Sequence, residues 1–181
     1  QHFQNPGNNL NNIYSNSDIK NKTKVVNGTR GALNIIQPIY FNDTICYIVP
    51  KGFLECKTLS NEEIIFSLDV KIEGSKEYEV IRGGLAFFDN QIVLVDAYGQ
   101  VILINANDGS KIWQKKIDFP ILSPPLIYRS KVYFISSDNR LFSLTLETGE
   151  IDWSFQTIAE TKKSLITASP IAYENTIIAP F

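Results

Sequence analysis

Short apolar runs alternate with short polar separators along most of the chain from position 38 onward. The runs are three to six residues long and rich in Ile, Val, Tyr and Phe, which favours β-strands. Separators such as Asn42-Asp43 and Ser60-Asn61-Glu62 consist of residues that favour turns. No segment keeps the spacing of about 3.6 residues between apolar positions that a helix of three turns requires. The pattern therefore predicts an all-β chain of short strands with essentially no helix.

The apolar runs fall into three groups of four. The expected strands are 38–41, 44–49, 53–58 and 64–68 in the first group, 85–88, 91–96, 101–105 and 111–115 in the second, and 126–128, 131–136, 141–145 and 150–155 in the third.

One unit of sequence occurs twice in the middle of the chain. Leu85 is followed by Gly109 after 24 residues and by Trp113 after 28. A second copy begins 40 residues later, at Pro125, and places a glycine (Gly149) and a tryptophan (Trp153) at the same offsets. A shared spacing of this length separates a true repeat from two unrelated tryptophans.

The same register extends toward both ends of the chain. Pro38 begins an earlier copy, with Phe66 at the tryptophan position, and Pro170 begins a later one. The four starts, at 38, 85, 125 and 170, are 47, 40 and 45 residues apart. Periods of about 40–50 residues with four short strands each are typical of β-propeller blades. We therefore predict a partial β-propeller of three four-stranded blades and the start of a fourth.

This register divides the chain into the parts of one truncated propeller domain. They are a loosely held polar arm at 1–30, blade 1 at 31–70, a charged loop at 71–81, blade 2 at 82–119, blade 3 at 120–158, and a loop with the start of blade 4 at 159–181.

The repeated residues have a mechanical explanation. Gly109 and Gly149 fall where the third strand reverses into the fourth, and glycine accepts positive φ there without a Cβ clash. Trp113 and Trp153 then lie on the outer strand, where a large ring can bury ~150–250 Å² against the next blade and donate its N–H to a carbonyl. Phe66 takes this place in blade 1. We interpret these residues as structural contacts between blades, without a ligand role.

The two cysteines, Cys46 and Cys56, flank a predicted hairpin loop at 50–52. Counting outward from this loop places them directly opposite each other on antiparallel strands. Opposed Cβ atoms lie ~4.5–5.5 Å apart, slightly beyond the distance usual in a disulfide. The spacing therefore favours two buried thiols, and a disulfide remains the alternative.

The composition of the chain excludes several classes of function. A formal charge of -2 gives no general attraction to nucleic acid or to an anionic membrane, and no run approaches the ~20 apolar residues that span a bilayer. The only histidine, His2, has no partners at ligand spacing, so we expect no metal site and no cofactor. The chain lacks methionine and ends within an apolar run, which indicates a fragment of a longer protein.

The repeat unit of this sequence resembles that of a known family. The closing pattern of a Thr-Gly or Asp-Gly pair and a tryptophan four residues after the glycine is similar to the repeat of PQQ-type β-propellers. Within that group the chain most resembles the BamB family, in particular its alphaproteobacterial form. This narrower resemblance rests on three stretches: Gln4-Asn5-Pro6-Gly7-Asn8-Asn9, Gly83-Gly84-Leu85-Ala86-Phe87, and Ile158-Ala159-Glu160-Thr161 followed by Ala168-Ser169-Pro170-Ile171-Ala172.

The resemblance implies a non-enzymatic subunit of the outer-membrane β-barrel assembly machinery. Members of the family form an eight-bladed ring on the periplasmic face of the bacterial outer membrane, where a lipid anchor holds them. They dock on the barrel-inserting (BamA-like) subunit, and unfolded outer-membrane proteins are further candidate partners. The anchored cysteine would lie upstream of Gln1.

Partner docking in the family uses the loop before the fourth blade. The matching loop here offers Leu165 and Ile166 for apolar contact, preceded by Lys162 and Lys163, where the family has an arginine after the apolar pair. Lysine does not reproduce a bidentate guanidinium–carboxylate contact. The alternative is that the lysines form a solvated loop tip and Leu165 starts a strand.

Two other functions remain open. PQQ-dependent dehydrogenases share this ring, but their chemistry needs a base carboxylate and a metal site of carboxylate and amide oxygens, which this sequence does not assemble. A periplasmic binding propeller of unrelated role is the other alternative.

Overall fold

Short strands joined by tight turns pair with their neighbours in the chain and so build antiparallel meanders. The computed structural model describes residues 36–49, 52–72, 82–157 and 168–181, whose strands form three sheets of four and one of two. Blade 1 contains β1 (Ile39–Phe41), β2 (Thr44–Val49), β3 (Phe53–Thr58) and β4 (Ile64–Asp69); blade 2 contains β5 (Gly83–Phe88), β6 (Gln91–Asp96), β7 (Gln100–Asn105) and β8 (Lys111–Lys116). Blade 3 contains β9 (Leu126–Tyr128), β10 (Lys131–Ile135), β11 (Arg140–Thr145) and β12 (Ile151–Gln156), and the last hairpin is β13 (Ile171–Tyr173) with β14 (Thr176–Ile178).

The predicted fold class is confirmed. Every strand expected from the apolar runs is present, with ends shifted by two residues at most, and the described part of the chain contains no helix. It accordingly holds no helix long and apolar enough to cross a membrane. The predicted arm at 1–30, most of the charged loop at 71–81 and the first part of the segment at 159–181 lie outside the described residues.

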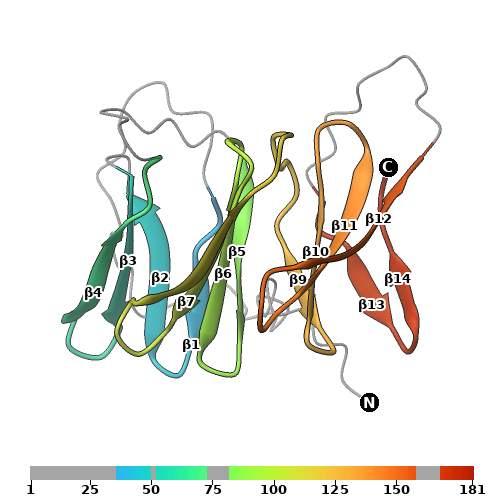
Figure 1. Ribbon diagram of the computed structural model, residues 1–181. Coiled ribbons are helices and arrows are strands. Elements are labelled where there is room, and N and C mark those ends of the chain that lie inside the picture. Colours follow the sequence, from blue (N-terminus) through green and yellow to red (C-terminus); the bar gives the residue numbers. More distant parts are fainter. Residues whose placement is uncertain (1–35, 50–51, 73–81, 158–167) are drawn as a thin grey trace, which may run out of the picture.

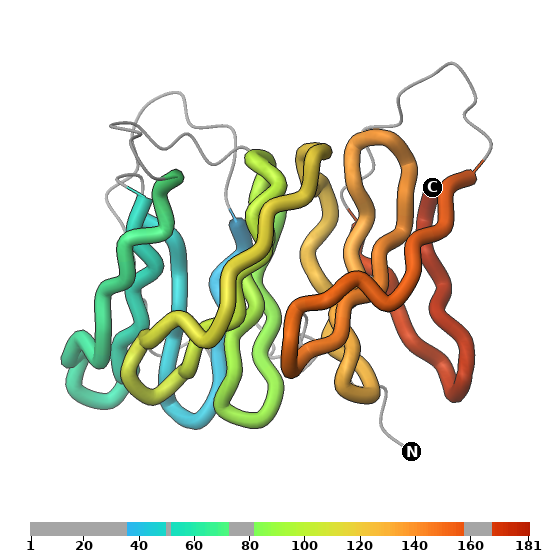
Figure 2. Tube along the Cα trace, in the orientation of Figure 1, coloured from blue at the N-terminus to red at the C-terminus, as the bar shows by residue number. Residues whose placement is uncertain are grey.

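The sheets stand side by side in chain order, from blade 1 through blades 2 and 3 to the β13–β14 hairpin (Figures 1 and 2). Each sheet is a simple meander, so chain order and spatial order agree within every blade. Successive blades are related by the 40- to 47-residue register, and the partial propeller is the result.

Each blade repeats one backbone link at its first hairpin. In blade 1 the turn residues Asn42 and Asp43 both have positive φ, as two-residue hairpin turns of the favoured type require. The carbonyl oxygen of Asp43 accepts a hydrogen bond at 2.8 Å from the backbone N–H of Leu59, which follows β3. Blades 2 and 3 repeat this bond between Ala106 and Asn90 and between Leu146 and Ser130. In each blade this hydrogen bond joins the turn after the first strand to the turn after the third strand, which lie at the same rim.

Blade 2 is apolar on both faces because both are covered. Ile92 and Leu94 belong to the cluster shared with blade 1, whereas Val93 and Val95 belong to the cluster shared with blade 3. All four side chains are fully buried. Alternate residues of a strand point to opposite faces, so the unbroken run of apolar residues in β6 is what a doubly covered strand requires.

The flank beyond blade 3 differs, because two strands of the described residues, β13 and β14, lie against it. Ala172 and Ile177 pack on blade 3, while the other face of this hairpin exposes Ile171 and Tyr173. Along β12, Trp153 and its alternate neighbours Ile151 and Phe155 are exposed as well.

Candidate functional site

Equivalent side chains form one row across each blade, on the face that looks toward the next blade. The pairing of strands 2, 3 and 4 brings these residues side by side. We call them the seam rows: Cys46, Cys56 and Phe66 in blade 1, Val93, Leu103 and Trp113 in blade 2, and Tyr133, Ser143 and Trp153 in blade 3.

Trp113 joins blade 2 to blade 3. Its indole Nε1–H donates a hydrogen bond of 2.8 Å to the carbonyl oxygen of Leu146, in the turn after β11. Its ring lies directly over Gly149 in the same turn, where an added Cβ would come within 2.8 Å of Trp113 Cδ2. The side chain thus satisfies its one polar atom and buries its ring on a neighbouring backbone, as expected for a large aromatic contact.

Phe66 makes the corresponding contact between blades 1 and 2. It covers Gly109, where an added Cβ would lie 2.6 Å from Phe66 Cγ. Gly109 and Gly149 have φ values of 75° and 68°, in the left-handed region where a side chain is strained. Both glycines therefore meet two demands, a left-handed turn and an aromatic ring against the Cα.

Each seam row also sits beside a backbone irregularity. The pairing of the third and fourth strands shifts between Cys56 and Lys57, between Leu103 and Ile104, and between Ser143 and Leu144. A β-bulge inserts one residue and bends the strand, which re-aims the following side chains. Its recurrence at one position makes it part of the repeat.

The ends of the described arc depart from this pattern. Trp153 occupies the equivalent position in blade 3, where its ring contacts Tyr133 at a centroid distance of 6.0 Å and stays 40% exposed. In blade 1 the glycine position of the turn holds Glu62, with φ 59°. Its backbone has the conformation of the two glycines, and its side chain is exposed.

We predict that Gly149→Ala lowers the free energy of unfolding by about 2 kcal/mol, since alanine is strained at this φ and its Cβ displaces the Trp113 ring. Urea unfolding measures the change. Glu62→Gly is the matched control: relief of strain and the freer unfolded chain nearly cancel, so its effect should stay below about 1 kcal/mol. If Gly149→Ala lowered the free energy of unfolding by less than about 1 kcal/mol, the Trp113 ring would be able to move aside without loss of stability.

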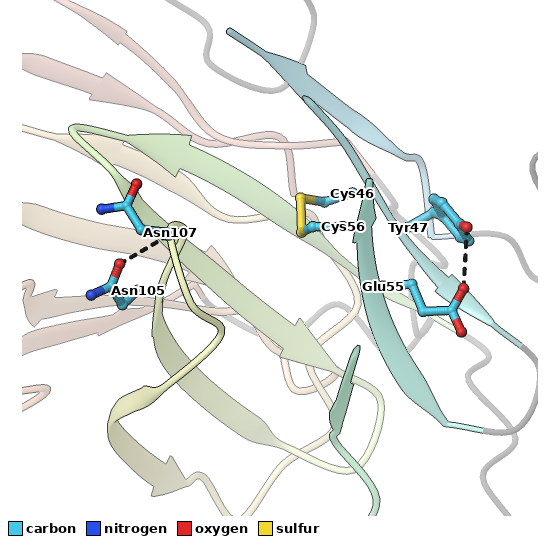
Figure 3. The surroundings of a disulfide bond; sticks show 6 residues. All are labelled: Cys46, Tyr47, Glu55, Cys56, Asn105 and Asn107. Carbon is cyan, nitrogen blue, oxygen red and sulfur yellow. Dashed lines mark hydrogen bonds between the residues drawn. A yellow bond between two sulfur atoms is a disulfide. The ribbon is translucent and has the colours of Figure 1, made fainter. Parts of the chain in front are cut away.

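Cys46 and Cys56 are joined by a disulfide, so the favoured interpretation of two thiols is wrong (Figure 3). The predicted pairing of the two residues across β2 and β3 is present. Their Cα atoms are 4.1 Å apart, close to the ~4.5 Å of pairs without mutual backbone hydrogen bonds, where side chains approach more closely. The sequence-based distance assumed an average pair, and this pair is narrower.

The opposite face of the same two strands holds a polar pair, Tyr47 and Glu55 (Figure 3). The Tyr47 hydroxyl donates to Glu55 Oε2 at 3.1 Å, and the tyrosine is only 6% exposed. Burial, with the hydrogen bond and the negative charge of Glu55 as smaller causes, raises the pKa of Tyr47 to about 12.

We predict that Tyr47 makes the fold sensitive to alkali. An unfolded tyrosine ionises near pH 10, whereas the folded one resists, so stability falls as pH rises from about 10 toward 12. The difference in tyrosinate absorbance between the wild type and Tyr47→Phe isolates this transition. Glu55→Gln should bring the pKa of Tyr47 only part of the way back toward 10, since burial is the larger cause of the shift. Ionisation of Tyr47 at pH 10 in the folded protein would contradict the prediction.

A buried polar network that sequence reasoning missed lies at the rim where β6 turns into β7, opposite the rim of the first hairpin turns. Gln100 Nε2 donates to Asp96 Oδ2 at 2.8 Å and to the carbonyl oxygen of Val70, at the end of blade 1, at 3.1 Å. Gln114 Nε2 in turn donates to Gln100 Oε1 at 2.8 Å. Asp96 is fully buried, and its Oδ1 accepts the backbone N–H groups of Tyr98 and Gln100. Polar residues at the end of an apolar strand were its only signal in the sequence.

The predicted partner-binding residues Lys162, Lys163, Leu165 and Ile166 lie outside the described residues. The structure describes the chain on either side, at Thr157 and Ala168. The backbone N–H of Thr157 donates to the carbonyl oxygen of Asn139, in the turn between β10 and β11. Thr157, the last described residue before the segment, therefore lies at the rim that holds this turn.

Two carboxyl groups of the described residues have a lowered pKa. The N–H and hydroxyl groups of Ser110 hydrogen-bond Asp108 and lower the pKa of this carboxyl, and the N–H of Lys71 does the same for Asp69. Within 36–49, 52–72, 82–157 and 168–181, no three His, Cys, Asp or Glu side chains gather as a metal site.

A comparison with protein families identifies the group to which this architecture belongs. The family model described as outer membrane protein assembly factor BamB matches residues 59–181. The chain belongs to the BamB family. The match runs from the turn before β4 of blade 1 to Phe181 and includes the glycine–tryptophan seam between blades 2 and 3. No curated protein matches the sequence significantly.

Solved structures agree with this fold. BamB from Moraxella catarrhalis superposes with a TM-score of 0.66 at 21% identity, over 77% of this chain and 40% of that one. A quinohemoprotein alcohol dehydrogenase, ADHIIG, from Pseudomonas putida HK5 gives 0.57 at 16% identity, over 67% and 20%. The computationally designed protein Ika4 gives 0.63 at 15% identity, over 83% and 87%. These TM-scores demonstrate a shared fold, and the chain spans less than half the length of the BamB structure.

Proposed function

We propose that this BamB-family chain is part of a non-enzymatic scaffold that docks on the barrel-inserting subunit of the outer-membrane β-barrel assembly machinery. The observation that carries the proposal is the family match over residues 59–181. In this function the stacked blades hold a rigid arc, and loops at its rim make the contacts with the partner.

The use of the repeated residues supports a scaffold. Trp113 and Phe66 are occupied by contacts between blades, and Gly109 and Gly149 accommodate their rings. These residues thus maintain the spacing of neighbouring sheets. Their repetition has a mechanical cause, so it does not require a bound ligand.

The disulfide supports a periplasmic location on independent physical grounds. Disulfides form and persist in oxidising compartments, which include the bacterial periplasm, and are rare where cellular thiols keep cysteines reduced. Cys46 and Cys56 form such a bond on the face of blade 1 that stacks on blade 2, where both are fully buried. The bond fits a protein that works at the periplasmic face of the outer membrane.

The docking segment is the loop at 161–167, with Leu165 and Ile166 as apolar contacts and Lys162 and Lys163 as charged ones. Substituting both Leu165 and Ile166 by aspartate in the complete protein should reduce co-purification with the barrel-inserting subunit at least about tenfold, as loss of a desolvated apolar contact does. Unchanged recovery would remove this segment from the interface.

The matched control places the same two charges on exposed apolar positions elsewhere. Phe88, at the end of β5, is 44% exposed, and Ile112, on β8, is 48% exposed. Phe88→Asp with Ile112→Asp adds the same charge without touching the proposed segment, and recovery should stay near the wild-type level. Equal losses in both variants would mean that charge alone weakens the complex.

The similarity to a quinohemoprotein alcohol dehydrogenase keeps a quinone-dependent enzyme as the second candidate. The complete purified protein distinguishes the two. An absorbing cofactor that survives gel filtration would replace the scaffold proposal by the enzyme. Recovery of no assembly subunit and no cofactor would instead favour a periplasmic binding propeller of another role.

A further inference from the structure

The disulfide of blade 1 lies on the face that stacks against blade 2. Cys46 and Cys56 are both 0% exposed and share one apolar cluster with Ile92, Leu94 and Ile104 of blade 2. The Tyr47–Glu55 pair occupies the opposite face of the hairpin (Figure 3). The seam between blades 1 and 2 therefore covers the sulfur atoms.

Thiol–disulfide exchange needs access that this seam denies. A thiolate must reach a sulfur atom and form a mixed disulfide, so the reaction depends on exposure of that sulfur. Burial among apolar side chains also raises the pKa of a free thiol and leaves it inert. Neither oxidation of the two thiols nor reduction of the bond can proceed through another protein while the seam is closed.

The groups that align the two cysteines all belong to one hairpin. β2 and β3 pair from Thr44 and Thr58 to Val49 and Phe53, and the cysteines are opposed within this ladder, 10 residues apart in sequence. A hairpin of this kind forms locally and early compared with contacts between sheets. The sulfur atoms can therefore meet before blade 2 is in place.

We infer that the Cys46–Cys56 bond is made by exchange with a protein disulfide of the oxidising compartment before blade 1 stacks on blade 2. One cysteine thiolate attacks the oxidant's disulfide, forms a mixed disulfide and releases one thiolate of the oxidant. The second cysteine thiolate then attacks the first cysteine's sulfur and releases the other. Two electrons pass to the oxidant, which becomes a dithiol as the two cysteines lose their protons. Closing of the seam then seals the bond.

The test compares two glycine substitutions of identical chemistry at neighbouring seams. Gly109→Ala drives a Cβ into Phe66 and loosens the seam that covers the disulfide, whereas Gly149→Ala drives one into Trp113 at the next seam. The full chain is incubated with dithiothreitol without denaturant, and freed thiols are alkylated and counted by intact mass. Gly109→Ala should speed reduction at least about tenfold, and Gly149→Ala less than about threefold, because local opening governs exposure.

Two results would overturn the inference. Equal acceleration by both variants would show that the seam between blades 1 and 2 is not what protects the bond. Reduction of the wild type in buffer as fast as in concentrated urea would show that the seam gives no protection, and this measurement holds even where Gly109→Ala fails to fold.

Bond formation supplies the converse measurement. Wild-type chain refolded without oxidant and then given glutathione disulfide should oxidise at least about tenfold more slowly than chain refolded in its presence. Equal rates would mean that oxidation does not need to precede stacking.

Discussion

Trp113→Ala should lower the free energy of unfolding by about 3 kcal/mol, the lower end of the loss typical of a large buried aromatic side chain, because the Trp113 ring is only partly buried. The substitution removes the ring from Gly149 and the hydrogen bond to the Leu146 carbonyl oxygen, so blade 2 loses its anchor on blade 3. Urea unfolding followed by circular dichroism measures the effect without relying on the fluorescence of the removed indole.

Trp153→Ala is the matched control for this loss. Trp153 has the same place in its blade but is 40% exposed in the described arc, so its removal should cost this chain less than half as much. Trp113→Phe separates the two contributions, because it retains most of the ring contact and removes only a hydrogen bond of about 1 kcal/mol. Equal losses for Trp113→Ala and Trp153→Ala would contradict a role of Trp113 in the seam.

The repeated part of this fold could be predicted because one physical problem recurs. Every internal blade must bury two faces. The turn before its fourth strand must also fit under an aromatic ring of the preceding blade. Gly109 and Gly149 meet the second requirement, and Trp113 makes the contact between blades that its 28-residue offset predicted. Strand positions followed from the same register, since alternation and turn residues are local signals.

Features that depend on the geometry of one place could not be predicted in this way. The cysteines were paired correctly, but whether they bond depends on how closely the two strands approach at this pair. The link from Gln100 to the Val70 carbonyl oxygen joins residues whose sequence separation is 30, and no local pattern encodes such a contact. The recurring bulge beside each seam row leaves no gap in the apolar pattern and is likewise silent in the sequence.

Blade 1 combines two weaker substitutions with one additional constraint. Phe66 replaces the tryptophan of the repeat and has no indole N–H to donate, and Glu62 holds a left-handed turn that glycine holds in the other blades. The disulfide occurs in blade 1. The equivalent positions of blade 2 hold Val93 and Leu103. A covalent link within the hairpin therefore stabilises the described blade that deviates most from the repeat.

Replacing both cysteines by alanine should consequently lower the free energy of unfolding by about 3 kcal/mol or more. Closing a loop of this length constrains the unfolded chain by about 2–3 kcal/mol, and alanine also leaves a small cavity in the seam. Cys46→Val with Cys56→Leu, which copies the pair of blade 2, is the matched control. It refills the seam without restoring the constraint, so it should recover part of the loss and remain about 2 kcal/mol below the oxidised wild type. Urea unfolding of all three proteins without reductant decides the matter: wild-type stability in the Val–Leu variant would show that the bond contributes packing alone.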